Sequence, residues 1–358
     1  MRLPNVKNSL HLLRHQLEER LGASYITKCS TLLLQVKGLK KYFPLQKGII
    51  ENLITKQKAY VHAVDDVSFT LKKGEIFGLV GESGSGKTTV GRLCVGLIEP
   101  TEGSIVFDGV DIATLDKLKL RQLRQHIQII FQDPTAALNP RMRVSDAIGR
   151  PLKIYGSYTK QEIRQAVFDA LDSVALSPPH AFYSRFPFEL SGGQRQRVVI
   201  ARSLVLNPKF IVADEPLAMV DVSVRAQIID IIERMRKEKG MTFLFITHDL
   251  ASAKYLCDRV AIMYAGQILE IATKQALFGN PQHPYTRALL SAVPVPDPKY
   301  QSKKMIVGGE VPSLVNPPSG CRFHPRCPYV QDVCRTTAQV LESVGDDHLV
   351  ACMIKPFR

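Results

Sequence analysis

One glycine-rich motif in this 358-residue chain is compatible with only a small group of folds. The motif and the residue after it read Gly81, Glu82, Ser83, Gly84, Ser85, Gly86, Lys87, Thr88 and Thr89. It follows the apolar run Ile76–Val80, which predicts a buried strand, and it opens a segment of helical pattern. The glycines let the backbone wrap around phosphate so that amides point inward. We expect Lys87 to bridge the β- and γ-phosphates of a nucleotide and the Thr88 hydroxyl to ligate Mg²⁺.

An acidic pair downstream fits the same site. The apolar run Phe210–Ala213 predicts a second buried strand, and Asp214 and Glu215 follow it directly. Carboxylates at the carboxyl end of a parallel strand lie beside the phosphate loop. We therefore expect Asp214 to hold Mg²⁺ through water and Glu215 to accept a proton from the attacking water.

The rest of the chain alternates between strand and helix patterns. Strands are predicted at 32–36, 66–71, 104–107, 127–131 and 243–246, and helical segments at 90–97, 146–176, 195–206 and 224–239. A surface loop is predicted over 44–58. This alternation favours an α/β fold with a mainly parallel sheet covered on both faces.

Charge and hydropathy limit the setting. The chain carries 47 basic and 33 acidic residues, a net charge of +14, which indicates an anionic partner. Its apolar runs are far shorter than the ~20 residues that span a bilayer, and its start lacks the apolar core of a signal peptide. We expect a cytosolic or peripheral protein. Residues 1–30 form an extension with a leucine stripe, either a short docking helix or an irregular start.

A third motif is specific for one family. Ser191 with Gly192, Gly193 and Gln194 predicts a capped helix start with free amides, a second anion-binding device. Together with the phosphate loop and the acidic strand, it resembles the signature of the ATP-binding cassette (ABC) family. The resemblance implies a P-loop NTPase core with an antiparallel β edge and an inserted α-helical subdomain. It also implies that the signature closes over ATP bound by a second subunit.

The resemblance assigns roles to further residues. Gln132 corresponds to the Q-loop glutamine that senses Mg²⁺ and contacts the membrane partner, and His248 to the switch histidine that holds the γ-phosphate. Phe43 is expected to stack on adenine, with Tyr42 as the alternative. The dimer-contact loop reads Ala218-Met219-Val220-Asp221, so it keeps the family's aspartate but lacks its serine hydroxyl.

The sequences of several segments resemble one branch of the ABC family, the ATP-binding subunits of oligopeptide/dipeptide importers. Within that branch they resemble the F-type subunit. These segments are Leu39–Pro44, Gly96–Gly103, Phe131–Met142 and Asn280–Arg287. The resemblance implies an ABC ATPase domain over 31–280, with the helical subdomain at about 134–190, and an importer-type C-terminal region over 281–358.

This branch implies ATP hydrolysis that powers peptide import at the cytoplasmic face of the cell membrane. The implied partners are a D-type ATPase subunit, two transmembrane permeases and, indirectly, an extracytoplasmic substrate-binding protein. Nickel chelates, glutathione or sugars remain alternative cargoes, because cargo is selected by other subunits. A soluble ATPase acting on nucleic acid is the competing class. No nucleic-acid module is recognisable, so we expect no nucleic-acid partner.

The C-terminal region carries clustered cysteines. Cys321, Cys327, Cys334 and Cys352 fall within the last 38 residues of the chain. Their spacing lacks the close pairs typical of zinc sites and the run typical of bacterial ferredoxins. The importer resemblance implies a [4Fe–4S] cluster with a structural role. Zinc, or free thiols and disulfides, are the alternatives.

Overall fold

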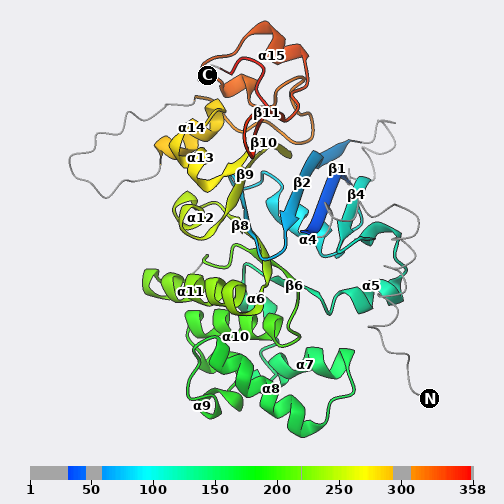
Figure 1. The fold of residues 1–358 in the computed structure, drawn as a ribbon, viewed down its shortest axis with the longest axis vertical. Helices are drawn as coiled ribbons and strands as arrows, with labels where there is room; N and C mark the ends of the chain where they lie inside the picture. The colour runs from blue at the N-terminus through cyan, green and yellow to red at the C-terminus, as the bar shows by residue number, and fades with distance from the viewer. Residues whose placement is uncertain (1–30, 46–58, 219, 293–307, 356–358) are drawn as a thin grey trace, which may run out of the picture.

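The computed structural model describes residues 31–45, 59–218, 220–292 and 308–355. The predicted extension over 1–30, most of the predicted loop over 44–58, and Met219 of the dimer-contact loop lie outside these residues. The described residues form two sheets, with helices packed around the larger one (Figure 1). The α/β fold class predicted from the sequence is confirmed.

The larger sheet has eight strands within the described residues, in the order β11-β12-β10-β9-β3-β8-β7-β6. The five strands from β9 to β6 run parallel. Their bounds are β3 Ile76–Val80, β6 Ile127–Ile130, β7 Phe210–Asp214, β8 Thr242–Thr247 and β9 Arg259–Tyr264. Every residue of β3, β7 and β8 is buried, as expected for central strands covered on both faces. The parallel arrangement brings the carboxyl ends of these strands to one edge.

The smaller sheet is antiparallel, in the order β2-β1-β4-β5. Its strands are β1 Leu32–Pro44, β2 Tyr60–Lys72, β4 Glu102–Phe107 and β5 Val110–Asp111. The strands predicted at 32–36 and 66–71 are therefore parts of longer ones. Pairing continues from Leu32↔Lys72 to Pro44↔Tyr60, with register shifts between Val36 and Tyr42. Such irregularities break the apolar alternation by which a strand is recognised in the sequence.

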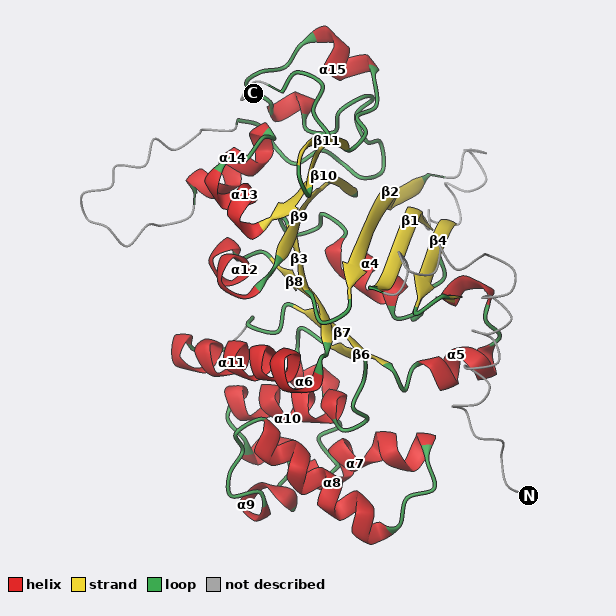
Figure 2. Ribbon diagram, viewed as in Figure 1, coloured by secondary structure: helices red, strands yellow, loops and turns green. Residues whose placement is uncertain are grey.

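Helices follow the parallel strands. They are α4 Lys87–Cys94, α5 Lys117–Leu123, α6 Pro134–Ala137, α7 Val144–Tyr155, α8 Lys160–Ser173, α9 His180–Tyr183, α10 Gly192–Leu204, α11 Val222–Lys239 and α12 Leu250–Leu256. Figure 2 shows α7 to α10 gathered at the end of the molecule opposite the C-terminal strands. This group fits the helical subdomain predicted at about 134–190, whose boundaries stay a prediction.

The C-terminal region adds to the main sheet. Strand β10 (Gln267–Thr273) pairs with β12 (His348–Val350), which pairs with β11 (Glu342–Gly345). The helices here are short: α13 Lys274–Gly279, α14 Pro284–Ser291 and α15 Asp332–Thr336. The side chains of Phe323, Cys321 and Cys334 are buried in the same core as the parallel strands. This region, predicted as an irregular extension, thus shares the core of the domain. No helix in the described ranges is long and apolar enough to cross a membrane.

Candidate nucleotide-binding site

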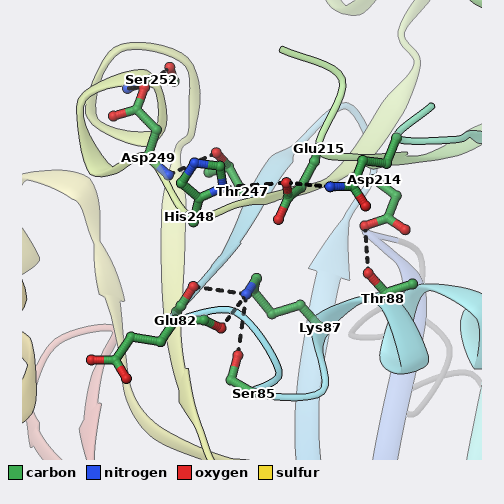
Figure 3. A network of polar contacts seen from close by, with 12 residues as sticks. Glu82, Ser85, Lys87, Thr88, Asp214, Glu215, Thr247, His248, Asp249 and Ser252 are labelled. Atoms are coloured by element: carbon green, nitrogen blue, oxygen red, sulfur yellow. Dashed lines mark hydrogen bonds and ion pairs between the residues drawn. The ribbon is translucent and has the colours of Figure 1, made fainter. Parts of the chain in front are cut away.

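The predicted phosphate loop connects β3 to α4 and is closed around its own lysine. Lys87 is buried, and its ammonium donates to the carbonyl oxygens of Gly81 at 2.8 Å and Glu82 at 2.7 Å (Figure 3). The hydroxyl oxygen of Ser85 lies 3.3 Å from the same ammonium. Burial lowers the pKa of Lys87, and the nearby carboxylates oppose that shift. The ammonium thus occupies the centre of the loop, where an anion would replace the carbonyls as its partner.

Two glycines of the loop admit no side chain. A Cβ on Gly81 would lie 2.1 Å from the carbonyl oxygen of Met263, and one on Gly86 would lie 2.1 Å from that of Ala63. Gly86 also has a φ of +103°, a conformation that other residues rarely adopt. Ser83 and Gly84 form the exposed tip. Thr89 follows in the first turn of α4 and is half-buried.

The predicted Mg²⁺ ligands lie together. The Thr88 hydroxyl donates a hydrogen bond to Oδ1 of Asp214 at 3.0 Å, which joins the start of α4 to the end of β7. Asp214 is buried, and desolvation raises its pKa. A hydroxyl and a carboxylate beside a phosphate loop are the oxygen donors that Mg²⁺ uses in such sites, so this pair fits the ion.

Glu215 is the point where three loops meet. Its Oε2 accepts a hydrogen bond from Nε2 of Gln132 at 3.0 Å and lies 3.3 Å from Nδ1 of His248. Gln132 follows β6, Glu215 follows β7 and His248 follows β8, so the parallel sheet brings the three predicted catalytic residues together. Glu215 adopts φ +47°, and its backbone N–H donates to the Ile246 carbonyl at 2.9 Å. A carboxylate with one mostly exposed imidazole and one amide neighbour is suited to orient and deprotonate water.

The two aromatic candidates for adenine stacking differ in their surroundings. The Tyr42 hydroxyl donates to Oδ1 of Asp65 at 2.5 Å, and its ring packs against His62 with centroids 4.2 Å apart. Phe43 is 38% exposed, and the Lys41 ammonium lies 5.2 Å from its ring centroid. Phe43 is therefore exposed, whereas Tyr42 is half-buried. Its role as the stacking residue stays a prediction.

The signature segment begins α10, and Ser191 is its N-cap. Ser191 Oγ accepts from the Gln194 N–H at 3.3 Å, and Oε1 of Gln194 accepts from the Ser191 N–H at 3.0 Å. Ser191 is exposed, whereas Gly192 and Gly193 are half-buried in the first turn. A Cβ on Gly193 would lie 2.7 Å from Val224 of α11, so the two helices approach closely there.

The single chain does not join this signature to its own phosphate loop. Helix α10 packs on α6, α7, α8 and β6, and within the described residues none of the hydrogen bonds of Ser191–Gln194 reaches the loop. Asp221 caps α11 with an exposed side chain that accepts no capping bond. Ser191 and Asp221 are thus exposed in the single chain, although Ser191 and Gln194 cap each other.

Comparison with known proteins agrees with this geometry. A family model described as ABC transporter matches residues 64–218, and one described as oligopeptide/dipeptide transporter, C-terminal region, matches 269–334. The oligopeptide transport ATP-binding protein AppF of Bacillus subtilis is 45% identical over 323 residues, which cover 89% of this chain and 96% of AppF. The chain belongs to the ABC transporter family. A protein of Brucella ovis reaches 48% identity over 90% of this chain and 98% of its own length.

Solved structures of ABC cassettes share the fold. A dimeric ATP-binding cassette in a post-hydrolysis state, bound to ADP and Pi, superposes with a TM-score of 0.60. It is 27% identical and covers 68% of this chain and 99% of its own. A cassette named cbiO1 from Clostridium perfringens superposes with a TM-score of 0.59 at 27% identity, covering 70% and 92%. The ATP-binding character predicted from the motifs is confirmed.

The four C-terminal cysteines of this ABC subunit line one pocket. Cys321, Cys327, Cys334 and Cys352 surround it together with His283 and other residues. Burial raises the pKa of Cys321 to about 12 and also raises the pKa of Cys327 and Cys352. In the described part of the chain, no three His, Cys, Asp or Glu side chains are close enough to hold a metal ion.

This arrangement does not by itself distinguish the metals expected from the sequence, because the described residues form no group that holds a zinc ion or a cluster as they stand. The convergence supports a common role for the four thiols, but the [4Fe–4S] cluster itself stays a prediction.

Sequence reasoning missed the contacts that the C-terminal region makes with the ATPase domain. Arg326 pairs with Glu82 and the Tyr285 hydroxyl accepts from the Glu82 N–H, both at the phosphate loop, while Arg322 pairs with Asp65 of β2. Arg322 and Arg326 flank the cysteines in sequence, and this was the available signal. Nothing local indicated that the partner of Arg326 lies 244 residues away.

Proposed function

We propose that this chain hydrolyses ATP to power the import of peptides through a membrane ABC transporter. ATP hydrolysis is supported by one observation: Gln132 and His248 both contact Oε2 of Glu215, beside the Thr88–Asp214 pair. The match of residues 269–334 to the oligopeptide/dipeptide transporter model and the name of AppF support a peptide cargo.

The residues divide the chemistry among them. The loop amides and Lys87 bind the phosphates, and Phe43 stacks on the base. Thr88, Asp214 and Gln132 would hold Mg²⁺, which would screen the charge of the phosphates. Glu215 takes a proton from water, and His248 orients that water against the γ-phosphate. Because Oε2 of Glu215 is within reach of both the amide and the imidazole, the carboxylate is kept facing the loop.

The complete site requires two subunits. Ser191, Gly192, Gly193 and Gln194 offer their polar groups to the ATP held by a second cassette, and Asp221 contacts that cassette. The proposal is supported by the exposed position of Ser191 and Asp221 in the single chain. We propose a D-type ATPase subunit as the second cassette, in keeping with the F-type wording of this sequence. The closed pair of subunits would bind ATP more tightly than the open pair, so ATP binding would favour the closed conformation.

Closure would be passed to the membrane through the segment that follows Gln132. Asp133 caps the short helix α6 by accepting from the backbone N–H groups of Thr135 and Ala136. Arg202 of α10 donates to the Ala137 carbonyl at 2.6 Å, which ties α6 to the signature helix. We propose that this unit contacts two permease subunits at the cytoplasmic face of the membrane. On the opposite side, an extracytoplasmic binding protein would deliver cargo to the same permeases.

We also propose that the cysteine pocket holds a [4Fe–4S] cluster with a structural role. The support is that four thiols, spread from Cys321 to Cys352, line one pocket at the edge of the main core. Cys321 would have to bind as a thiolate, and a bound metal cation would lower the pKa that burial raises. Metal binding would contribute folding free energy to a segment that has few regular elements.

The test is purification of the tagged chain from mild-detergent extracts of its native membranes, with mass-spectrometric identification of its partners. We expect two multi-span permeases and a second cassette subunit, and the ligand of the associated binding protein then identifies the cargo. Recovery of nucleic acid or ribosomal proteins at physiological salt, without a permease, would overturn the transporter function. The same preparation with Glu215→Gln serves as a matched control, because closure without hydrolysis should increase recovery of the second cassette.

A further inference from the structure

An arginine from the C-terminal region reaches into the phosphate loop. Nη1 of Arg326 lies 3.2 Å from Oε2 and 3.4 Å from Oε1 of Glu82. The side chain of Arg326 is 12% exposed and that of Glu82 is 31% exposed, so the pair is partly screened from water. Glu82 is the second residue of the loop, and its carbonyl accepts from the Lys87 ammonium. The ion pair therefore acts on the same residue that holds the nucleotide-binding lysine.

Buried tyrosines hold both members of this pair. Nη1 of Arg326 also donates to the Tyr264 hydroxyl at 3.3 Å, and its guanidinium lies 5.8 Å from the centre of the Tyr264 ring. The Tyr285 hydroxyl accepts from the backbone N–H of Glu82 at 3.3 Å. The two tyrosine rings lie 4.6 Å apart, and both contact Phe323 of the cysteine region. The backbone and the carboxylate of Glu82 are thus fixed by one aromatic cluster.

The negative charge of Glu82 links its contact with Arg326 to the binding of ATP. A carboxylate in a loop that binds phosphates repels the triphosphate unless it is neutralised or turned away. Both conditions are met here. Figure 3 shows the Glu82 carboxylate pointing away from Lys87, and the guanidinium of Arg326 pairs with it. Without Arg326, the carboxylate would lose both its counter-charge and its anchor.

We propose that Arg326 is a positioning residue for ATP, acting through Glu82, and that it couples the C-terminal region to the phosphate loop. The inference rests on ATP binding by this loop and goes beyond it, since it assigns to the C-terminal region a role in nucleotide affinity. Arg326 precedes Cys327 of the cysteine pocket, so the fold of that pocket sets where the guanidinium lies.

The experiment is a double-mutant cycle on the full-length chain. Four proteins are compared: wild type, Arg326→Gln, Glu82→Gln and the double variant. The measured quantities are the Kd for Mg-ATP, by displacement of a fluorescent ATP analogue, and KM and kcat of ATP hydrolysis. We expect Arg326→Gln to raise Kd and KM about tenfold and to change kcat less than about twofold. In the Glu82→Gln background the same substitution should change Kd by less than about twofold, because no carboxylate remains to neutralise.

Two further variants separate positioning from loss of structure. Arg326→Lys keeps the charge but loses the planar fork, so we expect an intermediate Kd. Arg335→Ala removes an exposed arginine of the same region and should leave Kd at the wild-type value. Melting temperatures of all variants report whether they are folded. An unchanged Kd in folded Arg326→Gln overturns the proposal, and so does a raised Kd that persists in the Glu82→Gln background.

The design keeps this inference distinct from the proposed function. Binding of ATP by the wild-type chain tests the function, whereas the ratio between variants tests the role of Arg326. If Arg326→Gln fails to fold, Arg326→Lys replaces it in the double-mutant cycle. Its effect on the Kd for Mg-ATP is then measured in the wild-type chain and in Glu82→Gln. A Lys variant whose Kd differs from wild type by the same factor in both backgrounds would then overturn the proposal.

Discussion

The side-chain amide of Gln132 donates a hydrogen bond to Oε2 of Glu215 across 3.0 Å, although 83 residues separate them. This contact joins the loop after β6 to the loop after β7. It links the residue expected to contact the membrane partner directly to the residue expected to activate water. Movement of Gln132 would therefore change the surroundings of the proposed general base, which would give a physical route between the proposed permease partner and hydrolysis.

The role of Glu215 as general base predicts the outcome of Glu215→Gln. The amide keeps the size of the side chain but cannot accept the proton of water. We expect turnover to fall by about 100-fold or more, since a positioned base typically contributes 10²–10⁴-fold. The Kd for Mg-ATP should stay within about twofold of wild type, because Glu215 does not bind the phosphates. Steady-state ATPase rates and nucleotide titration measure the two effects.

The matched control for this substitution is Glu233→Gln on α11. Glu233 pairs with Lys237 at 2.8 Å on the same helix and has no contact with the site. Its loss should leave turnover unchanged. Normal turnover in Glu215→Gln would refute the assignment of the base.

Lys87→Ala tests the phosphate loop itself. The ammonium donates to two loop carbonyls, and nucleotide phosphates would take over those hydrogen bonds. Charged hydrogen bonds of this kind contribute about 1.5–3 kcal/mol, so we expect Kd for Mg-ATP to rise about 10- to 100-fold. Lys239→Ala, at the exposed end of α11, is the control. ATP affinity equal to wild type in Lys87→Ala would show that the loop binds something else.

A buried glutamate fastens the C-terminal strands to the main sheet. Glu270 in β10 is fully buried, and Nε2 of His348 in β12 lies 2.7 Å from its Oε1. Its carboxylate also accepts from the backbone N–H groups of Gln282 and His283. We expect His348→Ala to lower the free energy of unfolding by about 1–3 kcal/mol, because it removes one hydrogen bond from a buried carboxylate and leaves its Oε1 with only the Gln282 N–H. Chemical denaturation at pH 7 measures this loss.

The same residue predicts a dependence of stability on pH. Burial by itself raises the pKa of Glu270, but the hydrogen bonds from His348, Thr286 and the backbone outweigh it and lower the pKa below 4.5. The carboxylate thus stays charged in the folded state at pH values where the unfolded chain takes up a proton. Its contribution is complete above about pH 4.5 and is lost as pH falls through the lower folded pKa. The stability difference between wild type and Glu270→Gln should therefore shrink below that pH. A difference that grows on acidification would contradict the assignment.

The cysteine pocket predicts iron in the purified protein. Anaerobic preparations should contain about four iron and four sulfide per chain, with broad visible absorbance, as a [4Fe–4S] cluster requires. Cys334→Ser should lose iron and lower the melting temperature, because metal binding contributes to folding. Cys94→Ala, in the core outside the pocket, should keep its iron. Protein without iron or visible absorbance would exclude the cluster.

The sequence alone named most of the residues that the structure brings together at the candidate nucleotide site. The phosphate loop, the acidic pair and the capped signature each depend on local geometry: a strand, a turn and a helix start whose residues are adjacent in the chain. Their positions at the ends of β3 and β7 and at the start of α10 are therefore readable from neighbouring residues. The strands β1 and β2 were predicted too short, because register shifts in their outer halves interrupt the apolar alternation.

Contacts between distant segments were decided by the tertiary structure. The sequence could not indicate that Arg326 would pair with Glu82, or that β12 would join β10 through His348 and Glu270. Long-range pairing depends on how all the intervening elements pack, and the side chains involved carry no periodic or local signal. Residue order thus determined the chemistry of the phosphate loop. Packing of the C-terminal region against the sheet determined which residues hold that loop in place.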